Sequence, residues 1–217
     1  MMRLLTIACV SLCAFACSPQ QKESNPLPAI ILDTDIGPDY DDVGAVAMLH
    51  AYADSGLVKP LAIIASNAQA LVVPSIDILN TFYGRPDLPT GVPKGPNAPN
   101  AEASQGWATL IAAKYPHKIK SSADAPDAIE TYRKILSSQP DSSVTIVTVG
   151  FLTNMAGLLD SPSDQFSPLS GKELIHQKVK KLVSMAGKFP AGREYNVLID
   201  SVASEKVFTQ WPTEIIF

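Results

Sequence analysis

Ten consecutive residues, 33–42, hold five acidic side chains and constrain this chain more than any other stretch. Apolar residues 29–32 precede them and apolar residues 43–49 follow, a spacing that predicts a buried parallel strand, a loop and a helix. The acidic groups then gather at the carboxyl end of the strand, where open α/β sheets bind ligands. Unit charges about 4 Å apart repel each other by roughly 4 kcal/mol at an effective dielectric near 20. Several ionised carboxylates in one loop therefore favour a bound cation, and a hard, oxygen-preferring metal ion suits them.

A second interpretation of the same stretch stays open. Acidic groups in the first turn of a helix are stabilised by its macrodipole, so Asp39, Asp41 and Asp42 also suit a helix N-terminus. That interpretation leaves Asp33 and Asp35, at the end of the strand, without an explanation. A metal or acid–base site is therefore the leading hypothesis.

The rest of the chain alternates apolar runs with amphipathic stretches at the spacing of βαβ units, which predicts an open, doubly wound α/β fold with a mostly parallel sheet. The expected strands are residues 29–32, 58–65, 89–92, 144–149 and 179–186, and the expected helices are residues 74–83, 107–115, 125–138 and 202–211. Residues 93–104, rich in proline, glycine and asparagine, should form a long loop beside the site. Trp107 either packs in the core or presents its ring to a ligand.

The first residues have the features of a bacterial lipoprotein signal peptide, over residues 1–16. We expect cleavage before Cys17, lipidation of its thiol, and a polar tether over residues 17–27. The alternative, an uncleaved anchor helix, would need a longer apolar run to span a bilayer. This pattern predicts a lipid-anchored protein of a bacterial cell envelope, on the periplasmic or the outer-membrane face.

All three cysteines lie at or before position 17, which excludes disulfides, zinc–thiolate sites and cysteine nucleophiles from the domain that follows. The three histidines are scattered and show no metal-ligand spacing. A net charge of −4 provides no basic surface for nucleic acid. We therefore expect a small-molecule partner, and a homo-oligomer stays open.

The acidic stretch and three later motifs, taken in order, resemble the inosine/uridine-preferring nucleoside hydrolase family. The first motif is an Asp-x-Asp, a Gly and an Asp pair, here Asp33, Asp35, Gly37, Asp41 and Asp42, with two more residues before the pair than in the commonest form. The later motifs are an Asn after the second strand, a Gly-Leu-Thr-Asn turn, and a sugar-binding Met with a Glu-aromatic-Asn segment. They correspond to Asn67, residues 149–154, Met185 and residues 194–196. The resemblance extends over residues 29–217.

The resemblance implies a hydrolase that cleaves the N-glycosidic bond of ribonucleosides to give ribose and free base, as in nucleoside salvage. It implies a Ca²⁺ ion held by Asp35, Asp42 and the backbone carbonyl of Val149, with Asp35 also the general base on a calcium-bound water. The implied substrate contacts are Asp41, Asn67, Glu194, Asn196 and Met185. Asp33 is expected to orient the loop.

The sequence also departs from the family. Family members continue past the position of Phe217 and supply a His–Asp pair there, so we expect residues 28–217 to be the N-terminal portion of a longer domain. The loop 187–193 is short and lacks the family's Asn, and residues 93–107 lack its His. These departures leave the preferred base open.

They also motivate an alternative function, a non-catalytic surface lipoprotein that binds a sugar or nucleoside through calcium. A third interpretation, a phosphatase built on Asp33 and Asp35, is less favoured. Such enzymes usually have Thr or Val where Gly37 stands, and they do not need the Asp pair.

Overall fold

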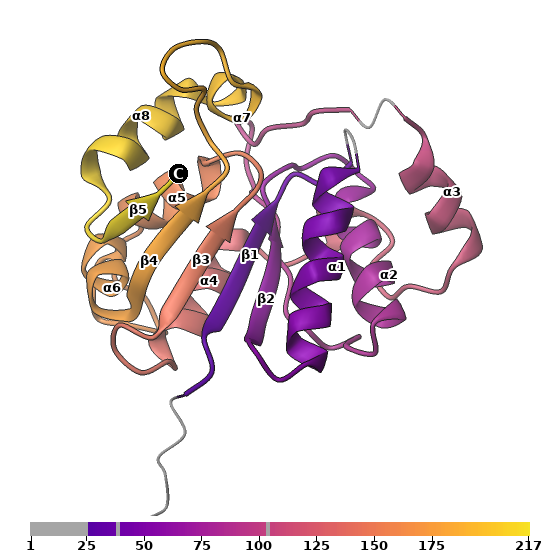
Figure 1. Cartoon of the computed structure of the whole chain (residues 1–217), viewed down its shortest axis with the longest axis horizontal. Coiled ribbons are helices and arrows are strands. Elements are labelled where there is room, and N and C mark those ends of the chain that lie inside the picture. The colour runs from indigo at the N-terminus through magenta and orange to yellow at the C-terminus, as the bar shows by residue number, and fades with distance from the viewer. Residues whose placement is uncertain (1–25, 38–39, 103–104) are drawn as a thin grey trace, which may run out of the picture.

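The computed structural model describes residues 26–37, 40–102 and 105–217 (Figure 1). The predicted signal segment 1–16, Cys17, residues 18–25 of the predicted tether and Asp39 lie outside the described residues. The elements in chain order are β1 (Ala29–Thr34), α1 (Asp41–Asp54), β2 (Lys59–Ala65), α2 (Val72–Phe82), α3 (Trp107–Lys114), the 3₁₀ turn η1 (Ser122–Asp124), α4 (Ala128–Ser137), β3 (Val144–Thr148), α5 (Thr153–Asp160), α6 (Gly171–Lys178), β4 (Val179–Ser184), α7 (Tyr195–Ile199), α8 (Ser201–Gln210) and β5 (Glu214–Ile216). Over these ranges, no helix is both long enough and apolar enough to cross a membrane.

The strands form one parallel sheet in the order β2-β1-β3-β4-β5. The chain passes from β1 to β2 on one side and returns to β3 on the other, so the strand order reverses between β1 and β3. The register places Asp33 beside Ile64 of β2 and Thr148 of β3, so the three strands end at the same edge. A reversal of this kind opens a ligand-binding crevice at the carboxyl ends. The predicted parallel α/β fold is confirmed.

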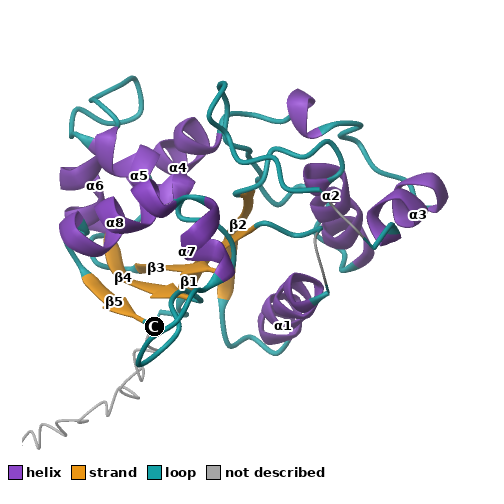
Figure 2. Ribbon diagram, turned by 90° about the horizontal axis from the view of Figure 1, so that it is seen from above, coloured by secondary structure: helices purple, strands orange, loops and turns teal. Residues whose placement is uncertain are grey.

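Helices cover both faces, because successive side chains of a strand point to opposite sides. Helices α4, α5, α6 and α8 gather over one face (Figure 2), where Ile31 and Tyr132 belong to one core cluster. Helices α1 and α2 contribute to a second cluster, in which Leu32 lies with Val46 and Ile76. The crevice between β1 and β3 therefore stands on a packed, two-sided base.

The predicted strand at residues 89–92 is wrong as a member of the sheet. This segment runs beside β2 and accepts two hydrogen bonds, from the Ile63 N–H to the Pro89 carbonyl (3.0 Å) and from the Ala65 N–H to the Gly91 carbonyl (2.8 Å). Val92 forms only an isolated bridge with Asp127. Pro89 has no N–H to donate, so the segment cannot continue the ladder as a full strand.

Helix α6 was not predicted, although its start has a clear sequence signal. The Ser170 hydroxyl accepts from the Glu173 N–H, and the Glu173 carboxylate accepts from the Ser170 N–H, which together form a capping box. Helix α4 begins three residues later than predicted, because Pro126 precedes Asp127, whose carboxylate caps the helix by accepting from the Glu130 N–H (2.9 Å).

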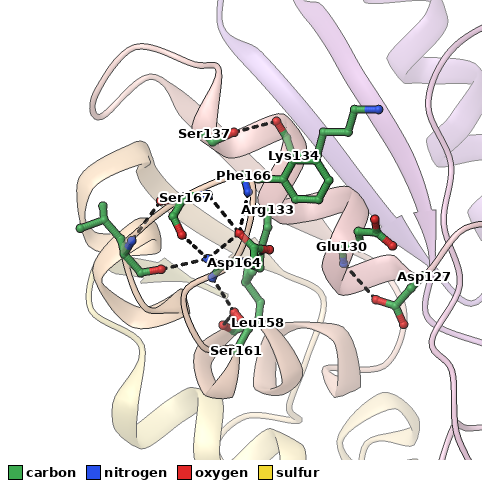
Figure 3. A network of polar contacts seen from close by, with 11 residues as sticks. Asp127, Glu130, Arg133, Lys134, Ser137, Leu158, Ser161, Asp164, Phe166 and Ser167 are labelled. Carbon is green, nitrogen blue, oxygen red and sulfur yellow. Dashed lines mark hydrogen bonds and ion pairs between the residues drawn. The ribbon is translucent and has the colours of Figure 1, made fainter.

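The loop before α6 is held by a buried arginine on α4 (Figure 3). The Arg133 side chain is 2% exposed, and it donates to the Asp164 carboxylate through Nε (2.7 Å) and Nη2 (3.1 Å). It also donates to the Ser161 hydroxyl and to the carbonyls of Ser167 and Leu169. The Arg133 hydrogen bond lowers the pKa of Asp164. One guanidinium thus satisfies most of the polar groups that this loop turns inward.

We predict that Arg133→Met lowers the free energy of unfolding by about 2–3 kcal/mol, because removing one partner of a buried ion pair leaves the other groups unsatisfied. Urea unfolding followed by circular dichroism measures the change. The matched control is Lys118→Met, which removes an exposed ion pair with Asp87 and should leave the unfolding midpoint unchanged. Equal urea midpoints for wild type and Arg133→Met would show that Arg133 does not stabilise the loop before α6.

Candidate active site

The end of β1 and the start of α1 are joined by a side-chain hydrogen bond. The Thr34 hydroxyl donates to the Asp42 carboxylate and accepts from the Ile36 N–H (3.1 Å). Asp35 and Asp42 are both buried, at 4% and 3% exposure. The predicted strand–loop–helix unit therefore brings these two carboxylates to the crevice between β1 and β3.

The end of β3 lies directly against Asp35, at Gly150. A Cβ atom on Gly150 would be 2.3 Å from the Ser66 Oγ and 2.4 Å from the Asp35 backbone nitrogen, so only glycine fits. The Val149 N–H donates to the Asp33 carbonyl (2.8 Å) and the Phe151 N–H donates to the Ser66 Oγ (3.1 Å). This close approach places Val149 at the same edge as Asp35, as the metal hypothesis requires.

Asn67 follows β2, and hydrogen bonds use both ends of its amide. Its Nδ2 donates to the carbonyls of Ala101 (2.9 Å) and Asp35 (3.4 Å), and its Oδ1 accepts from the N–H groups of Gln69 (3.1 Å) and Ala101 (3.0 Å). Asn67 is fully buried, and these four bonds use both hydrogens and both oxygen lone pairs of its amide, so it ties the long loop before α3 to the backbone of Asp35. The structure gives it no free group for the ribose contact, which stays a prediction.

The predicted sugar-binding segment reaches the same edge from β4 and α7. The Asn196 Nδ2 donates to the carbonyls of Val149 (3.0 Å) and Met185 (3.2 Å), which leaves the amide oxygen as the group that can accept from a ligand. Glu194 caps α7, since its carboxylate accepts from the N–H groups of Asn196 (2.9 Å) and Val197 (3.0 Å). Asn196 thus connects the backbone carbonyls of Val149 and Met185 to Glu194 through hydrogen bonds.

Asp33 lies beneath these residues, fully buried. Its Oδ2 accepts from the Tyr132 hydroxyl (2.8 Å) and from the Asn154 Nδ2 (2.9 Å), which also donates to the Ala65 carbonyl (2.7 Å). Burial raises the pKa of Asp33 to about 7, against the opposing effect of these hydrogen bonds, and the nearby Asp42 adds to the rise. Asp33 acts as a structural hub below the site, consistent with its predicted role in orienting the loop.

The donor atoms at this edge are oxygens. Asp35 and Asp42 supply carboxylates, and the Val149 carbonyl has a second lone pair besides the one that Asn196 engages. Carboxylate and carbonyl oxygens suit a hard cation such as Ca²⁺, which takes about six to eight oxygen ligands in irregular geometry. Across the described ranges, no group of three or more His, Cys, Asp or Glu side chains is arranged to hold a metal. Backbone oxygens would therefore have to contribute to any such site.

Comparison with known proteins identifies the family. The family model for inosine-uridine preferring nucleoside hydrolase matches residues 30–217. The chain belongs to this family. Two nucleoside hydrolases of the same description are similar in sequence. The one from Crithidia fasciculata is 24% identical over 200 residues, and the one from Leishmania major is 25% identical over 190 residues. These matches cover 86% and 83% of this chain but 59% and 57% of the relatives, so the chain spans less than two thirds of their length.

Solved structures support the nucleoside hydrolase fold. A plant nucleoside hydrolase, PpNRh1, superposes with a TM-score of 0.61 at 22% identity, over 88% of this chain and 60% of that protein. The type III effector XopQ, solved with adenosine diphosphate ribose, superposes with a TM-score of 0.63 at 17% identity, over 86% and 54%. At these identities the likeness concerns the fold alone.

The sequence analysis missed several residues that support the nucleoside hydrolase site. No sequence pattern indicated the roles of Thr34, Ser66 and Tyr132. Their hydrogen-bond partners lie on other elements, most of them far away in the sequence. Asn154 belongs to the Gly-Leu-Thr-Asn turn of the family resemblance, which gave its side chain no role of its own. Its side chain bonds to Asp33, and that of Thr153 donates to Asp200 (2.6 Å).

We predict that Asp33→Asn flattens the pH dependence of stability between about pH 4 and pH 7 in calcium-free buffer. The raised pKa keeps Asp33 protonated in the folded state after the unfolded chain has lost that proton, so stability declines as pH rises through this range. The neutral amide removes that contribution. Thermal unfolding of both proteins at several pH values measures it, and parallel curves would show that Asp33 does not titrate as stated.

Proposed function

We propose that the complete protein hydrolyses the N-glycosidic bond of ribonucleosides, giving ribose and free base, with Ca²⁺ as its cofactor. The observation that carries this proposal is the carboxyl edge of β1 and β3, where the strand order reverses. Asp35 and Asp42 are buried in the segment that follows β1, and Gly150 at the end of β3 packs against Asp35, in a chain that belongs to the nucleoside hydrolase family. Membership in the family supplies the reaction class, and the oxygen donors support the choice of cation.

In the proposed reaction, Asp35 accepts a proton from the attacking water while the bond between ribose and base breaks. The sugar passes through a state with oxocarbenium character, and the neighbouring carboxylates stabilise its developing positive charge. A calcium ion held by Asp35, Asp42 and the Val149 carbonyl would align the water with the ribose hydroxyls and lower the pKa of that water. The base leaves with a proton, so water is consumed and no redox partner is needed.

The remaining polar groups would hold the ribose. We propose that Asp41 and the Asn196 amide oxygen bind its 2′ and 3′ hydroxyls, and that Asn67 acts from β2 by holding the backbone of Asp35 in place. The Glu194 carboxylate accepts from the N–H groups of Gly187, Asn196 and Val197, and it keeps capacity for one more bond, since an ionised carboxylate offers about four lone-pair positions. We propose that Glu194 accepts from the 5′ hydroxyl and that Met185, whose side chain is exposed, contacts the sugar.

We predict that the complete protein releases ribose from inosine or uridine, that a calcium chelator stops this release, and that added calcium restores it. Asp35→Ala should lower turnover by at least about a hundredfold, the usual scale for a lost general base. Asp42→Asn should weaken calcium binding measured by calorimetry. The matched control is Asp87→Asn on the surface, which should alter neither quantity.

A second candidate, a calcium-dependent binder that does not cleave, is favoured by the positions of the histidines. His50 is buried between α1 and α2, where it contacts the Asn80 amide (3.0 Å) and where burial lowers its pKa. His117 contacts the Tyr115 carbonyl (2.9 Å), and His176 lies in α6. His50 shares α1 with Asp42 but lies more than two turns further along the helix, and His117 and His176 are on segments that do not supply the candidate site, so none of the three is placed to protonate a leaving base. Calcium-dependent ribose binding without release of any base would establish the binder and contradict the hydrolase.

We propose further that the protein is lipid-anchored at Cys17 in a bacterial cell envelope, on the basis of the sequence of residues 1–17 alone. Labelled palmitate should be incorporated into the wild-type protein in its native host and not into Cys17→Ser. Labelling of the Cys17→Ser variant would contradict the anchor.

A further inference from the structure

Two aromatic side chains that are far apart in sequence meet beside the carboxylates. Tyr40 directly precedes Asp41 and Asp42, and Trp107 is the first residue of α3. Their ring centroids are 6.2 Å apart, and the ring planes are inclined by 35°. Figure 1 shows that α3 begins at the end of the molecule toward which the strands point. The pair therefore lies at the N-terminal ends of α1 and α3, next in the chain to Asp41 and Asp42.

The local structure does not account for the choice of tyrosine at position 40. Tyr40 occupies the N-cap position of α1, where Ser, Thr, Asp or Asn would bond to an unsatisfied N–H, and its side chain makes no capping bond. The residue is 57% exposed, so burial in the core does not explain the ring either. An aromatic ring held at this position is available to a ligand.

Packing alone does not account for Trp107. The residue is half-buried and contacts the core cluster of α1 and α2. Its indole Nε1 is buried, however, and has no hydrogen-bond partner in the part of the chain that the structure describes. A phenylalanine or leucine would fill this space without burying an unsatisfied donor. The broad indole ring adds what those residues lack, a large π-face that supports a second ring.

We infer that Tyr40, backed by Trp107, forms the platform on which the nucleobase of the substrate stacks. This inference rests on the proposed function, because the ribose must be held at the adjacent carboxylates for the base to reach Tyr40. A ribonucleoside has a polar sugar and a flat aromatic base, and the site has a polar cluster beside an exposed aromatic ring. Tyr40 adjoins Asp41 in the chain, so one short segment contacts both halves of the ligand.

A stacking platform also determines how strongly the site discriminates between nucleobases. Every nucleobase has a π-face, so stacking tolerates purines and pyrimidines alike. A purine covers more of the ring than a pyrimidine does, so it gains more from the contact. The structure thus assigns Tyr40 a role in binding the base, with a stronger effect on purine nucleosides.

The test uses the complete protein with calcium and the variants Tyr40→Ala, Trp107→Phe and Tyr52→Ala. Tyr40→Ala should raise KM for inosine about tenfold, the scale of one aromatic stack on a base, and KM for uridine less, with kcat nearly unchanged. Trp107→Phe keeps a ring behind Tyr40 and should raise KM less than Tyr40→Ala does. Tyr52→Ala is the matched control, because Tyr52 is an exposed tyrosine (47%) in the last turn of the same helix, α1.

A second measurement distinguishes binding of the base from binding of the sugar. Within residues 1–217, Trp211→Phe leaves Trp107 as the remaining tryptophan, and the difference in fluorescence between this variant and the same variant with Trp107→Phe reports on the platform. Hypoxanthine should quench this fluorescence and D-ribose should not, and Tyr40→Ala should weaken hypoxanthine binding about tenfold.

The outcomes distinguish this inference from the proposed function. One outcome would be that the protein hydrolyses nucleosides, that Tyr40→Ala leaves KM unchanged, and that hypoxanthine does not quench the fluorescence. This outcome would contradict the stacking platform and would still support the proposed hydrolase. A protein that neither cleaves nor binds any ribonucleoside would overturn both.

Discussion

The buried carboxyl of Asp33 is the interaction on which the carboxyl edge of the sheet depends. It joins β1 to α4 through the Tyr132 hydroxyl and to α5 through the Asn154 amide, which also bonds to the end of β2. Burial raises the pKa of this carboxyl to about 7 and raises that of Tyr132 as well. The Asp33 Oδ1 and the Asn154 Oδ1 have no partner within the described residues, so the bonds to the Asp33 Oδ2 are the ones that join these elements. Another arrangement would leave the Tyr132 hydroxyl and the Asn154 amide N–H without an acceptor inside an apolar layer, which favours the arrangement observed. The strand ends that carry the candidate ligands are positioned by this arrangement.

Above Asp33 the polar residues divide into those that hold the edge together and those that face a ligand. Thr34, Ser66, Gly150 and Asn67 are of the first kind, since their contacts run to neighbouring strands, loops and backbone groups. The Asp35 and Asp42 carboxylates, the Val149 carbonyl and the Asn196 amide oxygen are the groups that we propose for the second kind. The residues of the first kind hold the segment in which Asp35 and Asp42 are both buried, and buried carboxylates are groups that a hard cation stabilises.

Sequence reasoning located this edge correctly because its main signals are local. Residues 29–49 contain the strand, loop and helix pattern in one stretch, and the later motifs follow individual strands at the same end. Reasoning of the same kind failed at residues 89–92, where an apolar-looking segment follows the edge of β2 without joining the sheet. It also missed α6, whose capping box was legible at Ser170 and Glu173. The contacts of Tyr132, Asn154 and Arg133 gave no signal, because each joins side chains separated by roughly 30 to 120 positions.

The sequence by itself determined the α/β class, the family, and which carboxylates end the first strand, since hydrophobic period and motif order are properties of neighbouring residues. Only the tertiary structure decided that Gly150 must be a glycine, that Asn67 holds the loop before α3, and that the rings of Tyr40 and Trp107 come within 6.2 Å of each other. Each of these depends on how closely two distant segments approach. That distance is set by the packing of the helices on both faces of the sheet, which no local pattern encodes.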